Sequence, residues 1–145
     1  MLMARQDFYV NGENESRYVS LAWDAACKLL KELHAEALWI VALDMNKLKR
    51  GDIPDAIGVK NAECFAKGGQ FGVNGKNAKF YTERTLPRVG ENAIVLLIHP
   101  TASLMTKADQ IPICNALIVV PYFFKDVQQW IDLNKPTDVL QSMSP

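Results

Sequence analysis

At 145 residues the chain has the length of a single domain (1–145), and its 49% hydrophobic and 22% charged residues are typical of globular proteins. The net charge of zero argues against a protein that binds nucleic acid with its whole surface. No apolar run approaches the roughly 20 residues needed to cross a bilayer, and the N-terminal residues lack the apolar centre of a signal peptide. We therefore expect a cytoplasmic protein with no membrane partner.

The first half of the chain predicts a helix, a buried strand and a second helix. Apolar residues recur at three- and four-residue spacing over 18–35, which predicts an amphipathic helix. The continuous apolar run 37–43 has the length and composition of a strand buried on both faces. Residues 44–58 predict a loop because glycine and proline punctuate them, and Asp52 has the character of a turn residue there. A helix is predicted over 59–67, ended by two glycines.

The middle of the chain predicts a β-hairpin over 70–83. Two strand-like segments flank Asn74-Gly75, which is a strong turn signal. Beyond the hairpin, strands and helices alternate again, and this order predicts strands over 93–99 and 116–120 and helices over 101–110 and 123–133.

Strands that alternate with helices predict βαβ units and a parallel sheet covered on both faces. The expected fold class is therefore α/β, a small Rossmann-like three-layer domain with a parallel core sheet of about three strands plus an inserted β-hairpin. The pattern leaves open whether the hairpin extends the sheet or stands apart from it.

Polar residues follow each predicted strand, at the edge where open α/β sheets bind ligands. An Asp and a His there could orient one another or share a water, and two hydroxyls stand at a helix N-terminus, which favours anions. Three basic residues follow the first strand on the same edge. The candidate ligand-binding residues are Asp44, His99, Thr101, Ser103, Lys47, Lys49 and Arg50, with Pro121-Tyr122 following the third strand. The structural alternative is that the acid and the hydroxyls only cap backbone groups, and that His99 donates to a carbonyl.

The zero net charge conceals a basic middle segment. From Lys47 to Arg88 there are nine Lys or Arg against four Asp or Glu. Basic side chains on the hairpin alternate with Phe80 and Tyr81, an arrangement that suits contact with nucleic acid. The alternative, which we favour, is an ordinary solvated hairpin whose lysines protect a strand edge. Nucleic acid is therefore an unlikely partner in this interpretation.

Named catalytic and cofactor motifs are absent from the sequence. It has neither a dinucleotide-binding glycine motif nor a phosphate-binding loop, and no nucleophile elbow. The three cysteines and two histidines show no zinc-ligand spacing. We therefore predict no metal and no cofactor, and we interpret Cys27 and Cys114 as small buried hydrophobic residues.

The leading functional hypothesis is a binding or interaction domain without catalytic activity, associating with itself as a homodimer or with another protein. It rests on the lack of a convergent catalytic set, together with more aromatic side chains than the interior has room for, which makes Phe80, Tyr81 and Phe124 the interface candidates. The alternative is an enzyme or nucleotide-binding protein that uses Asp44, His99 and Thr101. A nucleic-acid accessory protein that uses the basic hairpin is the third hypothesis.

Overall fold

A single sheet of seven strands organises the computed structural model, which describes residues 5–13, 15–49, 51–88, 90–111 and 114–142. The strand order across the sheet is β3-β4-β2-β5-β6-β1-β7. Every neighbouring pair is parallel except β3 and β4. The strands are β1 (Gln6–Tyr9), β2 (Ala37–Ala42), β3 (Phe71–Val73), β4 (Lys76–Thr82), β5 (Ala93–Ile98), β6 (Ala116–Val120) and β7 (Thr137–Asp138).

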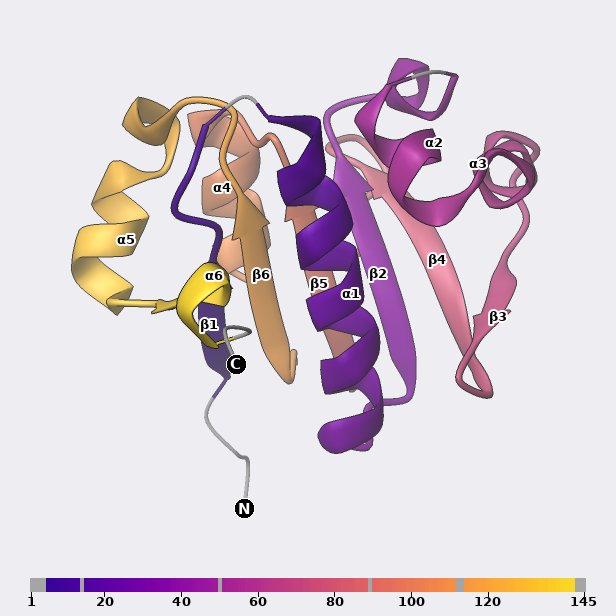
Figure 1. The fold of residues 1–145 in the computed structure, drawn as a ribbon, viewed down its shortest axis with the longest axis horizontal. Helices are drawn as coiled ribbons and strands as arrows, with labels where there is room; N and C mark the ends of the chain where they lie inside the picture. The colour runs from indigo at the N-terminus through magenta and orange to yellow at the C-terminus, as the bar shows by residue number, and fades with distance from the viewer. Residues whose placement is uncertain (1–4, 14, 50, 89, 112–113, 143–145) are drawn as a thin grey trace.

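Helices cover both faces of this sheet. The helices are α1 (Ser16–Glu32), α2 (Asp52–Ile57), α3 (Val59–Ala66), α4 (Ala102–Asp109), α5 (Gln128–Asn134) and α6 (Val139–Ser142), with short 3-10 turns at η1 (Met45–Leu48) and η2 (Phe124–Asp126). One face packs against α1, α2, α3 and α6, and the other packs against α4 and α5. Figure 1 shows α1 in front of the sheet and α4 behind it. The predicted three-layer, Rossmann-like α/β fold is confirmed.

The three predicted core strands form the centre of the sheet. Each residue of β2, β5 and β6 is buried, and side chains alternate between the two faces, as the pleat of a strand requires. Leu96 lies in the core beneath α1, whereas Val95 lies in the core beneath α4. The pairs Ile40↔Leu96 and Leu96↔Ile118 set the parallel register.

The predicted strand number of about three was too low. The 70–83 hairpin extends the sheet, because β4 pairs in parallel with β2 while β3 pairs antiparallel with β4. At the other edge, β1 pairs with β6 through contacts such as Phe8↔Ile118. β1 has only four residues and begins with the polar pair Gln6 and Asp7, so no apolar run identified it.

The predicted helices are present with shifted ends. The segment predicted over 123–133 is two pieces, η2 and α5, and the segment 44–58, predicted as a loop, contains η1 and α2. No helix in the described ranges is long and apolar enough to cross a membrane.

The connection from β4 to β5 is the one crossover of the described sheet whose described residues contain no helix. This crossover loop (residues 83–88 and 90–92) returns across the α4 side of the sheet, where Leu86 packs against the core. Near its end, the Trp39 indole Nε1 donates a hydrogen bond to the Glu91 carboxylate over 3.1 Å, and Lys79 Nζ also lies 3.1 Å from that group. A loop therefore occupies the place that a crossover helix fills elsewhere in such folds.

The chain leaves the neighbouring strands β2 and β5 in opposite directions. After β2 it passes on the α1 side toward β4, and after β5 it passes through α4 on the other side toward β6. This divergence opens the carboxyl ends of β2 and β5, and such a topological switch point is where open α/β sheets bind ligands.

Candidate functional site

A small pocket of about 210 Å³ lies at this switch point. The segment after β2 supplies one wall of the pocket, and the end of β5 supplies the second. Tyr122, two positions after β6, supplies the third. The pocket is lined by Lys47, Gly51, Asp52, Ile53, Ile98, His99 and Tyr122. We call this the rim pocket.

His99 holds the central position in the rim pocket. It is the first residue after β5, and its backbone N–H donates to the Val120 carbonyl over 2.8 Å, which continues the β5–β6 ladder by one step. Its φ of 50° lies in the left-handed region, which residues other than glycine seldom adopt. Such a conformation costs on the order of 1 kcal/mol and persists only where the surroundings enforce it. The imidazole side chain is only 11% exposed.

The electrostatics of the rim pocket favour a neutral imidazole. Burial lowers the pKa of His99 from its ordinary 6.5, the Asp52 carboxylate raises it, and Lys47 lowers it further. His99 Nε2 and Asp52 Oδ2 are 3.9 Å apart, which is beyond hydrogen-bond distance. Burial therefore outweighs the ion pair that a protonated His99 could form, and His99 and Asp52 are not hydrogen-bonded to each other in this structure.

Exposed apolar side chains surround the rim pocket. The Tyr122 ring packs edge-on against His99 at 5.3 Å and against Phe123 at 4.6 Å. Leu43 and Met45 follow β2 at the same edge of the sheet and are also exposed. These four residues, each at least 37% exposed, are four of the six large hydrophobic side chains that are exposed in the described part of the chain. We call Leu43, Met45, Tyr122 and Phe123 the rim patch.

Of the predicted rim residues in the described part of the chain, His99 and Lys47 line the rim pocket, as does Tyr122 after the third strand. Asp44 and Thr101 are helix caps: Asp44 accepts from the Asn46 backbone N–H at η1, and Thr101 accepts from that of Leu104 at α4. These are the structural roles weighed as alternatives above. Of the rest, Ser103 lies 3.5 Å from the Glu83 carboxylate, Lys49 is exposed outside the pocket, and Arg50 lies outside the described residues.

Asp52 is the charged pocket residue that the sequence interpretation missed. It was taken for a turn residue, but it opens α2 and lies beside His99. The helical signal of α2 is short and contains Pro54, so periodicity could not detect it. Proline near the start of a helix was the one available signal.

The aromatic interface candidates lie against the two cores. Phe80 packs on Phe65 with ring centroids 5.6 Å apart, and Tyr81 packs edge-on against Trp39 at 4.9 Å. Phe124 is partly buried against the core beneath α4. Because the rings of Phe80 and Tyr81 contact the cores, little of either is available for stacking on bases.

Other chemistry-bearing groups do not converge into a second reactive centre. Within the described ranges, no three His, Cys, Asp or Glu side chains are placed to hold a metal ion. Burial raises the pKa of Cys27 and that of Cys114 to about 11, so both thiols are protonated at neutral pH and are weak nucleophiles.

Comparison with protein-family models, with curated proteins and with solved structures found no match. The function is therefore argued from the geometry of the rim pocket and its surroundings.

The lowered pKa of His99 predicts that the protein loses stability on acidification. The unfolded histidine binds a proton near pH 6.5, whereas the folded one binds it at a lower pH. The contribution of His99 is therefore fully present above about pH 6.5 and is lost as the pH falls toward the folded pKa. We expect His99→Asn, which tolerates the left-handed backbone, to flatten the pH dependence of urea unfolding between about pH 7.5 and 5.5. The control is His34→Asn at an exposed position that also has positive φ. Identical pH profiles for wild type and His99→Asn would contradict the prediction.

Proposed function

We propose that the protein is a small binding domain without catalytic chemistry of its own, and that its ligand has a planar ring and an anionic group. The single observation that carries this proposal is the position of the rim pocket at the switch point between β2 and β5. At about 210 Å³ the pocket is smaller than most small-molecule sites, so part of the ligand remains outside against the rim patch. A cytoplasmic location belongs to the same proposal.

The lining side chains supply the chemistry for such a ligand. Lys47 offers a cation to an anionic group. The Tyr122 ring is 44% exposed and offers a surface for stacking. Neutral His99 carries one N–H donor and one acceptor nitrogen, which suits a heterocycle with mixed edges.

Binding fits the rim pocket better than catalysis does. General-base chemistry requires a base within hydrogen-bond reach of its partner and a group that orients it. The 3.9 Å separation of His99 and Asp52 does not meet that geometry. Asp44 and Thr101, the other residues of the enzyme hypothesis, are occupied in capping.

The test is a titration with AMP, adenosine and ribose 5-phosphate, followed by heteronuclear NMR. We expect AMP to shift the amide signals of Lys47, Asp52, His99 and Tyr122, with weaker shifts from the two fragments that lack the phosphate or the ring. Tyr122→Ala should weaken AMP binding about tenfold, because stacking on one base contributes roughly 1–3 kcal/mol.

Lys47 and Lys49 form a matched pair for this experiment. Both are exposed and two residues apart, but only Lys47 lines the rim pocket. Lys47→Ala should weaken AMP binding several-fold, whereas Lys49→Ala should leave it unchanged. Equal losses in both variants would indicate non-specific charge attraction, and no shifts at the rim with any probe would reject this ligand class.

The rim patch favours a second candidate, which is self-association through the same edge. Several exposed apolar side chains gathered at one edge are typical of interaction surfaces. A two-fold dimer buries the same patch twice, so the rim patch of a second copy is the matching partner. This version of the homodimer hypothesis replaces the core-packed Phe80, Tyr81 and Phe124 with Leu43, Met45, Tyr122 and Phe123 as interface residues.

A further inference from the structure

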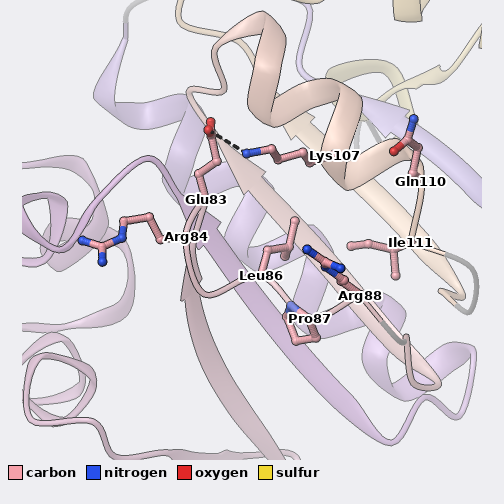
Figure 2. A pocket seen from close by; sticks show the side chains of 8 residues that line it. All are labelled: Glu83, Arg84, Leu86, Pro87, Arg88, Lys107, Gln110 and Ile111. Carbon is pink, nitrogen blue, oxygen red and sulfur yellow. Dashed lines mark hydrogen bonds and ion pairs between the residues drawn. The ribbon is translucent and has the colours of Figure 1, made fainter.

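The absence of a helix from the described crossover loop coincides with a second cavity, on the α4 side of the sheet. This cavity of about 420 Å³ lies between the loop and α4, and its volume is about twice that of the rim pocket. Its lining residues are Glu83, Arg84, Leu86, Pro87, Arg88, Lys107, Gln110 and Ile111 (Figure 2). We call it the back groove.

The back groove carries an excess of positive charge. Its lining contains three cationic side chains against one carboxylate, that of Glu83. The Glu83 carboxylate already accepts a hydrogen bond from Lys107 Nζ over 3.0 Å and lies 3.5 Å from Ser103 Oγ. Arg84 and Arg88 form no ion pair or hydrogen bond with any residue that the structure describes. Two guanidinium groups are therefore left without an anionic partner.

The apolar side chains of the back groove lie beside the guanidinium group of Arg88. Figure 2 shows the Arg88 guanidinium between Leu86 and Ile111, whereas the Arg84 side chain extends away from the other labelled residues. Lys107 reaches across from α4 to Glu83 on the opposite wall. Leu86, Pro87 and Ile111 supply apolar surface next to Arg88.

The groove on the other side of α4 has a different lining. This groove, of about 240 Å³, is lined by Asp109 and Asp126 and by no Lys or Arg. The Asp109 carboxylate is paired with Arg5 over 2.6 Å. The back groove therefore offers an anion a more positive lining than the groove on the α5 side does.

We propose that the back groove is a second binding site, which takes a small organic anion with an apolar chain. The anionic group, a carboxylate or a phosphate, pairs with Arg88, which can form two parallel hydrogen bonds to either. The apolar chain lies on Leu86, Pro87 and Ile111. A volume of 420 Å³ is within the range of small-molecule sites.

The experiment compares hexyl phosphate, hexanoate, inorganic phosphate and hexylammonium as probes in NMR titrations of the full chain. We expect both hexyl anions to shift the amide signals of residues 84–88 and 107–111. Both should bind at least about tenfold more tightly than inorganic phosphate, because their hexyl chains bury apolar surface that phosphate lacks. Hexylammonium should cause no shifts there. Equal affinity for hexyl phosphate and inorganic phosphate would overturn the proposal. So would the absence of shifts with hexyl phosphate and with hexanoate at concentrations up to about 10 mM, where even weak binding is detected.

Variants tie the binding to Arg88. Arg88→Ala should weaken binding of hexyl phosphate about tenfold or more, and Arg88→Lys should restore part of it as a single point charge. Arg17→Ala, an exposed arginine on α1 on the opposite face, is the control and should change nothing. A loss in Arg17→Ala equal to that in Arg88→Ala would also overturn the proposal. Lys47→Ala should leave this binding unchanged, so the back groove and the rim pocket are tested independently.

Discussion

Val119→Asp and Val95→Asp chains will fail to accumulate as soluble, cooperatively folded protein. Both valines are fully buried, and they lie on the neighbouring central strands β6 and β5 in the core beneath α4. A carboxyl group placed there has no partner. Burying it costs several kcal/mol, whether it stays ionised or is protonated. Total folding stability is about 5–15 kcal/mol, so either change removes most of it. Soluble yield and thermal unfolding followed by circular dichroism measure the outcome.

Val59→Asp provides the matched control for these two variants. Val59 is 63% exposed at the start of α3, where an added carboxylate stays in water and lies at the favourable end of the helix. This variant should express and unfold like the wild type. If Val119→Asp and Val95→Asp were also soluble and unfolded cooperatively, the burial of these strands would be wrong.

The central strands were predictable because burial on both faces produces an uninterrupted apolar run. The segments ALWIVA, AIVLLI and ALIVV carry that signal, and each is a wholly buried strand. The edge strands lack it, since one face or one end of each is in contact with water. β4 is only partly buried along its length, so it was interpreted as part of a hairpin whose relation to the sheet was left open. Its parallel pairing with β2 is a tertiary contact that no local pattern encodes.

The location of the candidate site on the sheet could be predicted, but the set of residues that line it could not. Topology alone brings the ends of parallel strands to one edge, so His99 and Lys47 were expected at the same edge, and both line the rim pocket. Whether a polar residue faces the pocket or caps a helix depends on one or two backbone angles. Asp44 accepts a hydrogen bond from the Asn46 backbone N–H, whereas Asp52, on a short helix, lies beside His99.

Most of the large exposed apolar side chains in the described part of the chain lie at the rim patch, and not at the aromatic side chains of the hairpin. Most of the aromatic side chains that seemed too numerous for the interior do pack against it. Phe65, Phe71 and Phe80 form one cluster on the α1 side of the sheet, and Trp39 and Tyr81 pair on the α4 side. The apolar surface left exposed is instead at the carboxyl rim. Polar replacements of Phe80 or Phe124 would therefore lower stability first and report poorly on an interface.

Light scattering at micromolar concentration should give twice the chain mass of 16.2 kDa if the rim patch pairs with its copy. Such a dimer should bury on the order of 1,000 Å² or more in total. Phe123→Ser, at a side chain of the rim patch that is 42% exposed, should return the mass to that of one chain while the monomer stays folded by circular dichroism. Leu133→Ser is the control, because Leu133 is 75% exposed on α5, away from the rim, and its loss should leave the dimer intact. A single-chain mass at every concentration, or a dimer that survives Phe123→Ser, would remove self-association through the rim and leave the rim patch to the ligand of the His99 pocket.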